Sequence, residues 1–218
     1  MGKKRYKYFD VRKITDLKDM VRQSAELHPD CSAFTLKDSN GSFTSVTYKK
    51  FLETINELGT ALLDLGLKDT KIAVMSENRY EWCLTYLAVV NGAGVIVPLD
   101  KELPINEVTS LMSRSEATAI VTSKDYINSI IDIKKDLPDL KYIISMDPVD
   151  EKEKDGIIYL YDLVEKGKKL IEAGNREYID APVNPEEMRM LIFTSGTTDK
   201  SKGVMLSHKN ICHDIMGV

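Results

Sequence analysis

The sequence predicts an α/β protein in which helices cover both faces of a sheet made largely of parallel strands. From residue 71 onward, short apolar runs alternate with longer amphipathic segments. Strands buried on both faces are typically continuous apolar runs, and a strand–helix–strand order favours parallel pairing. With 218 residues, 43% of them hydrophobic, the chain can bury the core of one large domain or two small ones.

The first elements are expected to precede that alternation. Thr15-Asp16 predicts a helix cap, and the apolar residues from Leu17 to Leu27 follow helical spacing until His28-Pro29 ends the helix. Two short strands, 31–36 and 42–46, are expected to form a hairpin, because the Asn-Gly pair between them is a strong turn signal.

A clear helix is expected after that hairpin. Thr47 is its predicted cap and Gly66 its predicted end, since glycine is common just past a helix C-terminus. Its apolar positions step by three and four and predict a core stripe, which comprises Tyr48, Phe51, Ile55, Leu58, Leu62 and Leu65.

The alternating region follows. Expected strands cover residues 72–75, 95–97, 119–121 and 142–144, and expected helices cover 78–90, 105–114, a segment opening at Ser123 or Asp125, and 160–173. The helix that opens at Ser123 or Asp125 is expected to carry Ile127, Ile130, Ile131 and Leu137. Asn91-Gly92-Ala93-Gly94 precedes a strand and lacks the full dinucleotide-binding fingerprint, so it predicts a tight helix-to-strand turn. Residues 147–155 and 175–187 are expected to be a solvated loop and a polar connector.

Composition and charge exclude several classes of protein. A net charge of −4 and a pI near 5.5 argue against nucleic acid as the main partner. No apolar run approaches the ~20 residues of a membrane span.

Residues 1–14 are expected to be a flexible basic segment without a signal-peptide core. Cys31, Cys83 and Cys212 lack ligand spacing, which predicts reduced, packing thiols of a cytoplasmic protein.

The segment most informative about function is 193–204, Phe-Thr-Ser-Gly-Thr-Thr-Asp-Lys-Ser-Lys-Gly-Val. The apolar run 190–193 predicts a buried strand before it, and 204–206 a second short strand after it. Glycine lets backbone N–H groups turn toward an anion, hydroxyls add donors, and Lys202 adds a positive charge. Lys202 precedes Gly203, so the spacing does not fit the P-loop of nucleoside triphosphatases.

This segment resembles the signature loop of the adenylate-forming (AMP-binding) superfamily, Tyr/Phe-Thr-Ser-Gly-Thr-Thr-Gly-x-Pro-Lys-Gly-Val. Ten of its twelve positions match if the variable one is counted. The following Met205-Leu206-Ser207-His208-x-Asn210 is most similar to long-chain acyl-CoA synthetases. Asn78-Arg79-x-Glu81-Trp82 and Gly92-Ala93-Gly94-Val95 also resemble that family, although Trp82 itself predicts packing better than substrate contact.

Two positions depart from the family pattern. Asp199 replaces a glycine and Ser201 replaces a proline. Aspartate tolerates a left-handed backbone, but its charge is expected to weaken phosphate binding unless Lys200 or a metal offsets it. Serine in place of proline leaves the unfolded loop more conformational freedom. Ordering the loop is therefore expected to cost roughly 0.4–1 kcal/mol more.

The resemblance implies that residues 15–218 are the N-terminal part of the large AMP-binding domain, without the C-terminal cap domain. It implies an ATP-dependent ligase that activates a fatty or similar carboxylic acid as an acyl-adenylate and transfers it to coenzyme A. The implied phosphate-binding residues are Thr194, Ser195, Gly196, Thr197, Thr198, Lys202 and Gly203. Mg²⁺ would bridge the phosphates near the Thr198 hydroxyl. No catalytic residue is assigned within the chain.

Other hypotheses remain open. The chain could be a non-enzymatic module that binds a phosphate-bearing ligand or a partner, or part of an amino-acid or aryl-acid adenylation domain. As an N-terminal fragment it is expected to have little ligase activity alone and to self-associate through uncovered sheet edges. His208 and His213 are five residues apart, which disfavours a metal site between them.

Overall fold

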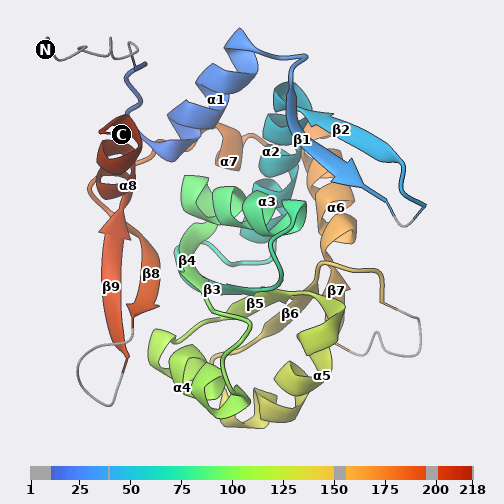
Figure 1. Ribbon diagram of the computed structural model, residues 1–218, viewed down its shortest axis with the longest axis vertical. Coiled ribbons are helices and arrows are strands. Elements are labelled where there is room, and N and C mark those ends of the chain that lie inside the picture. Colours follow the sequence, from blue (N-terminus) through green and yellow to red (C-terminus); the bar gives the residue numbers. More distant parts are fainter. Residues whose placement is uncertain (1–10, 39, 150–155, 195–200, 218) are drawn as a thin grey trace, which may run out of the picture.

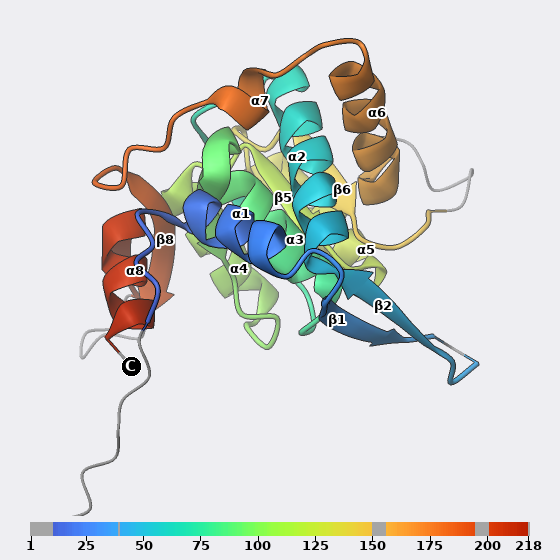
Figure 2. The same ribbon diagram turned by 90° about the horizontal axis from the view of Figure 1, so that it is seen from above.

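In the computed structural model, which describes residues 11–38, 40–149, 156–194 and 201–217, a seven-stranded sheet lies between two layers of helices (Figures 1 and 2). The strand order is β7-β6-β5-β3-β4-β8-β9, and every pair is parallel except β8–β9. The bounds are β3 Thr70–Met75, β4 Gly94–Pro98, β5 Ala119–Thr122, β6 Tyr142–Ser145, β7 Ile157–Tyr159, β8 Met188–Thr194 and β9 Lys202–Ser207. The predicted fold class is therefore confirmed.

Helices cover both faces of this sheet. On one face lie α2 (Tyr48–Asp64), α3 (Tyr80–Ala88) and α6 (Leu160–Glu172), and on the other lie α4 (Ile105–Ser115) and α5 (Lys124–Ile133), as Figure 1 shows. A single turn of π-helix, η1 (Val89–Ala93), joins α3 to β4, and a 3₁₀ turn, η2 (Lys134–Asp136), follows α5.

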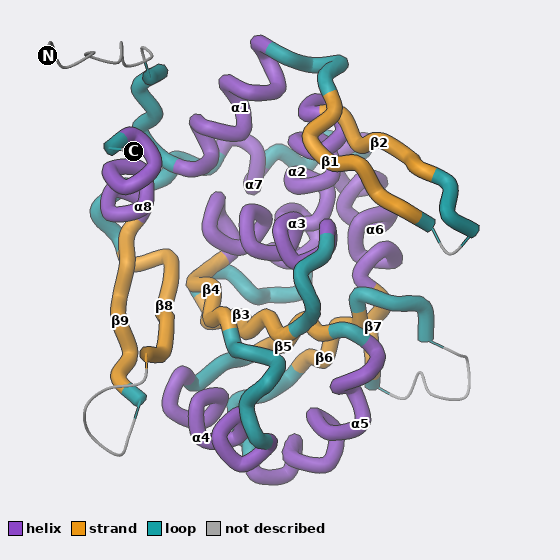
Figure 3. The backbone as a smooth tube through the Cα atoms, in the orientation of Figure 1, coloured by secondary structure: helices purple, strands orange, loops and turns teal. Residues whose placement is uncertain are grey.

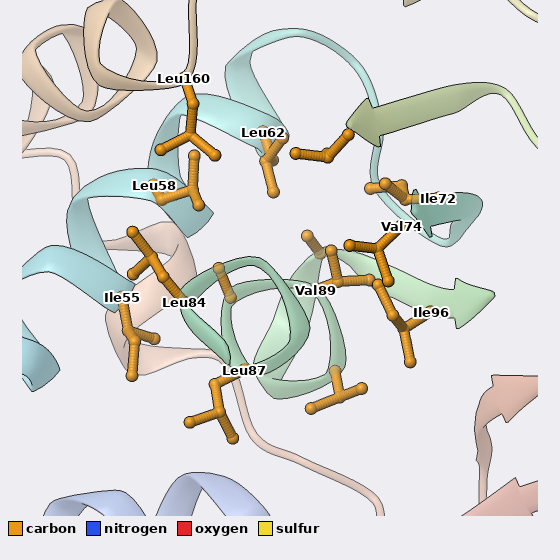
Figure 4. Close-up of a cluster of buried hydrophobic side chains, with 14 of the residues drawn as sticks. Ile55, Leu58, Leu62, Ile72, Val74, Leu84, Leu87, Val89, Ile96 and Leu160 are labelled. Atoms are coloured by element: carbon orange, nitrogen blue, oxygen red, sulfur yellow. The ribbon is translucent and has the colours of Figure 1, made fainter. Parts of the chain in front are cut away.

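The alternation of side chains along β3 divides the core in two. Ile72 and Val74 join the cluster under α2, α3 and α6 (Figure 4), whereas Ala73 and Met75 join the cluster under α4 and α5. Successive residues of a strand point to opposite faces, so a strand between two helical layers must be apolar throughout. This arrangement explains the continuous apolar runs of the sequence.

The N-terminal elements lie beside the first helical layer. Asp16 caps helix α1 (Leu17–Leu27), because its carboxylate accepts the Asp19 N–H. Thr47 caps α2 in the same way, since its hydroxyl accepts the Lys50 N–H. Between them, β1 (Ser32–Lys37) and β2 (Phe43–Thr47) form an antiparallel hairpin that extends from the body of the molecule (Figure 3). Both predicted caps and the predicted hairpin are confirmed.

Three elements were missing from the sequence-based description. Strand β7 follows the predicted loop, α7 (Glu177–Asp180) lies within the predicted polar connector, and α8 (His208–Met216) follows β9. The connector also carries Tyr178, the largest fully buried side chain among the described residues, whose hydroxyl donates to the Ala88 carbonyl at 2.9 Å. A short polar segment therefore reaches the core through one aromatic residue.

Three predictions about individual residues or runs were wrong. Ile131 lies in α5 as expected, but Leu137, although buried, lies beyond the end of α5. Cys31 is exposed and so does not pack, whereas Cys83 is half-buried and Cys212 buried. Strand β8 is not a buried strand, because Met190 alone among its residues is buried. It is the second strand from the sheet edge, next to β9.

Candidate phosphate-binding site

The predicted phosphate loop connects the antiparallel strands β8 and β9. Their last registered pair is Thr194 with Lys202, preceded by Phe193 with Gly203. The structure therefore brings together three of the predicted site residues, Thr194, Lys202 and Gly203, at the end of one hairpin. The other four, Ser195, Gly196, Thr197 and Thr198, lie outside the described residues, as does the predicted magnesium contact of Thr198.

Strand alternation places the two polar residues of this pair on one face. Ile192 and Leu206 pack against the first core cluster, whereas Leu191 and Phe193 pack against the second. Thr194 is two residues from Ile192, so Thr194 and its partner Lys202 share the face of the first cluster. Both are exposed, and a hydroxyl donor thus lies opposite a positive charge where the loop begins and ends.

Lys202 is available to an anion as far as the structure describes its surroundings. Among the described residues, no carboxylate lies within ion-pair distance of its ammonium group. Its exposed position at the first residue of β9 leaves the long side chain able to turn toward the loop.

The side chains of its own hairpin leave little room for a Cβ atom at Gly203. A Cβ atom at this position would lie 3.1 Å from Cδ1 of Leu191 and 3.5 Å from the ring of Phe193. The Phe193 side chain therefore occupies the space beside the Gly203 backbone. The sequence-based explanation, a backbone that passes close to a phosphate, stays a prediction for this residue.

The base of the hairpin is attached to the body through β4 and through the residues that follow β9. Strand β8 pairs with β4 at one registered position, Met190 with Ile96. Immediately after β9, the fully buried His208 accepts the Leu17 N–H at Nδ1 (3.0 Å), and its Nε2 lies 2.9 Å from the Val90 carbonyl oxygen. One imidazole thus joins the start of α1, the π-helical turn and the end of the hairpin.

These two hydrogen bonds require a neutral His208 that carries its proton on Nε2. Burial is the main cause of the lowered pKa of His208, and the positive charge of Arg189 lowers it further. The hydrogen bond to Val90 and the negative charge of Asp16 act in the opposite direction and raise this pKa. The sequence-based description considered His208 only as part of the family-like run after the loop and as a disfavoured metal ligand. The signal for its actual place was Ser207-x-x-Asn210, which forms a capping box and makes His208 the first residue of α8.

The family-like Asn78-Arg79-x-Glu81-Trp82 segment forms a separate polar cluster. Arg79 donates to Glu81 at 2.7 Å and to Asp147 at 2.9 Å, and Tyr161 donates to Glu81 at 2.9 Å. Burial alone would lower the pKa of Arg79, but the hydrogen bonds and charges of the two carboxylates raise it. Trp82 is half-buried and stacks on Tyr86, in agreement with its predicted packing role.

The described residues contain no group of three or more His, Cys, Asp or Glu side chains that could hold a metal ion. In the same part of the chain, no helix has both the length and the apolar character needed to cross a bilayer.

The model of the family described as "AMP-binding enzyme" matches residues 21–218. The chain belongs to this family. Over 97% of its own length, the chain is 30% identical to fatty acyl-CoA synthetase B of Dictyostelium discoideum. This match covers 33% of that synthetase. The chain is 33% identical over 79% of its length to long-chain-fatty-acid–CoA ligase 5 of Rattus norvegicus, of which it covers 26%. The chain thus spans about a third or less of the length of these AMP-binding relatives.

Solved structures share the fold of this AMP-binding chain. The crystal structure of the anthranilate CoA ligase AuaEII in complex with anthranoyl-AMP superposes with a TM-score of 0.76 and 17% identity. That match covers 92% of this chain and 36% of the ligase. It shows a common fold across most of the described sheet and its helices.

Proposed function

We propose that this AMP-binding chain carries the phosphate-binding part of an ATP-dependent acid–thiol ligase. In the proposed reaction, a carboxylate oxygen attacks the α-phosphate of ATP, pyrophosphate leaves, and the acyl-adenylate then passes its acyl group to the thiol of coenzyme A. The observation that carries the proposal is the pairing of Thr194 with Lys202 where β8 ends and β9 begins. This position is the neck of the family's signature loop.

The chain's own residues would stabilise the departing pyrophosphate. Its charge grows in the transition state, so fixed donors and a positive charge near the leaving group lower the barrier. Thr194 and Ser195 to Thr198 are proposed to donate to the β- and γ-phosphates, and Lys202 to pair with a phosphate oxygen. Mg²⁺, when bound near Thr198, would neutralise charge shared by these phosphates.

The substrate is proposed to be a fatty acid. The two curated relatives compared above are a fatty acyl-CoA synthetase and a long-chain-fatty-acid–CoA ligase, and both align with most of this chain. Because the chain spans about a third or less of each, we propose that it binds the ATP phosphates without forming an acyl-adenylate alone. Acyl-adenylate formed by the purified 218-residue chain, measured as pyrophosphate exchange into ATP, would contradict this part of the proposal.

Lys202→Ala tests the phosphate role directly. Loss of one charge-assisted contact is expected to weaken binding of Mg-ATP and of pyrophosphate by roughly 1.5–3 kcal/mol, about 10- to 140-fold in Kd. Isothermal titration of both ligands into the wild-type and variant chains measures this change.

Lys209→Ala is the matched control, because it removes the same charge from a half-exposed lysine that pairs with Glu186 outside the loop. Its affinity should equal that of the wild type. Equal weakening in the two variants would mean that the overall charge, and not a contact of Lys202, attracts the nucleotide.

Self-association is a further proposal for the chain in solution. Strand β9 lies at the edge of the sheet, and Met205 in its centre is 69% exposed. An unpaired, apolar strand edge favours pairing with another strand. Light scattering is expected to give a mass above that of one chain, and a mass of 24.6 kDa at all concentrations would contradict it.

A further inference from the structure

Arg114 contacts the phosphate-loop hairpin from a different helix. It lies in the last turn of α4, and its guanidinium donates to the Ser201 carbonyl oxygen at 2.8 Å. The same guanidinium lies over the ring of Phe193, with 5.2 Å between the guanidinium carbon and the ring centroid. The resemblance to the family did not single out this arginine.

The two residues that Arg114 contacts are on opposite sides of the loop. Phe193 precedes the last residue of β8, and Ser201 directly precedes β9. One guanidinium therefore contacts both the strand that precedes residues 195–200 and the residue that follows them.

The arginine is attached to a rigid support. Leu111 and Met112 of α4 are buried in the second core cluster, against which Leu191 and Phe193 also pack. Figure 1 shows α4 near the loop end of the β8–β9 hairpin, on the side of the sheet opposite α3. Arg114 thus reaches the hairpin from a helix that the core already holds in place.

Phe193 has two neighbours in this region. It pairs across the hairpin with Gly203, and the Arg114 guanidinium covers its ring. A cation over an aromatic face is attracted by the ring quadrupole. Because Phe193 faces the second cluster, Arg114 approaches the neck from the face opposite Thr194 and Lys202.

We propose that Arg114 is a positioning residue for phosphate binding, which holds the two ends of the loop at a fixed separation. This inference rests on the proposed function of the loop. Arg114 restrains the Ser201 carbonyl, so the peptide that leads into Lys202 keeps one orientation. Preorganised donors bind an anion more tightly because less conformational entropy is lost on binding.

The test compares three variants of the 218-residue chain by titration with pyrophosphate and with Mg-ATP. Arg114→Ala is expected to raise both Kd values about three- to tenfold, as for loss of a single partly solvated hydrogen bond. Arg114→Lys retains a donor and a cation, so it should recover more than half of the lost affinity. Arg22→Ala, which removes an exposed arginine from α1, should bind as the wild type does.

Amide hydrogen exchange separates positioning from a general structural role. In Arg114→Ala without ligand, exchange should accelerate at Thr194, Lys202 and Gly203, whereas the thermal midpoint and exchange in β3 and β5 should not change. Unchanged exchange at the neck, or faster exchange throughout the sheet, would overturn the positioning role.

The outcomes also separate this inference from the proposed function. If the wild-type chain binds neither ligand, the proposed function fails, and the exchange rates at the neck still decide whether Arg114 holds it. If the wild type binds and Arg114→Ala binds equally well, the positioning role fails while the proposed function stands.

Discussion

The interior strands and the β8–β9 hairpin belong to one sheet, but different interactions hold them. All four residues of β5 are buried, and so are the last four of β3. In β9 the first four residues are exposed, and β8 pairs with β4 at a single registered position. The interior is fixed by buried apolar area, whereas the hairpin depends on a few named side chains.

This difference predicts how each region responds to substitution. Burying one large apolar side chain contributes about 1.5–3 kcal/mol, and the interior has many of them. The hairpin is attached by the bonds of His208 and Arg114, by buried Met190 and by four half-buried side chains, Leu191, Ile192, Phe193 and Leu206. Steric changes should therefore matter most in the interior, and loss of a polar contact should matter most at the hairpin.

The largest effect is expected from Gly167→Ala in α6. A Cβ here would lie 1.7 Å from the backbone oxygen of Glu57 in α2, and a backbone atom cannot rotate away. The two helices would have to separate, which should lower the free energy of unfolding by about 3 kcal/mol or more. Urea unfolding followed by circular dichroism measures this change.

Lys168→Ala, at the next residue of the same helix, provides the control for Gly167→Ala. Lys168 is exposed, so this change should stay within about 0.5 kcal/mol of the wild type. If Gly167→Ala were equally harmless, close contact between α2 and α6 would not be the feature that holds the interior together.

The next largest effect is expected at the base of the hairpin, from His208→Phe. Phenylalanine fills a similar volume but leaves the Leu17 N–H and the Val90 carbonyl without their buried partner, at a cost of about 2 kcal/mol. His208→Gln keeps one donor and one acceptor and should cost less. Hydrogen exchange should accelerate more in β9 than in β5, and equal acceleration would show that the hairpin is not separately anchored.

His208 also predicts a pH dependence with a definite sign. Its pKa in the folded chain lies below the value of about 6.5 expected when unfolded, so the unfolded state binds the proton first as pH falls. The contribution of His208 is therefore complete above pH 6.5 and declines below it, by at most about 1.4 kcal/mol per pH unit, until the folded pKa is passed. The difference in unfolding free energy between wild type and His208→Gln, measured from pH 7.5 to 5, should shrink as pH falls. Parallel curves would contradict this prediction.

The contrast between the two regions also explains what the sequence could predict. Interior strands appear as apolar runs because both of their faces are buried, and the caps at Asp16 and Thr47 are local hydrogen bonds within three residues. Periodicity and spacing therefore recover them. The proposed phosphate-binding residues of the loop could also be named from the sequence, because its glycines, hydroxyls and lysine lie within one short segment.

Contacts between distant parts of the chain could not be predicted in the same way. Tyr178 bonds to Ala88, His208 to Leu17, and Arg114 to Ser201. Each pair is separated by more than 80 residues, so no local pattern links its members. Tyr178 was missed because most of the connector around it is polar or charged, and Arg114 because an exposed arginine at a helix end is usually solvated.

The smallest effect is expected for Arg79→Ala, at the carboxyl edge of the interior strands. Arg79 pairs with Glu81 and Asp147, but its side chain is 28% exposed and water can replace much of what is lost. We expect a cost of about 1 kcal/mol that shrinks further in 0.5 M salt, because salt screens ion pairs that water can reach. Urea unfolding at low and high salt measures both values. If Arg79→Ala instead cost as much as His208→Phe, the interior would depend on polar anchors as strongly as the hairpin does, and the contrast between the two regions would fail.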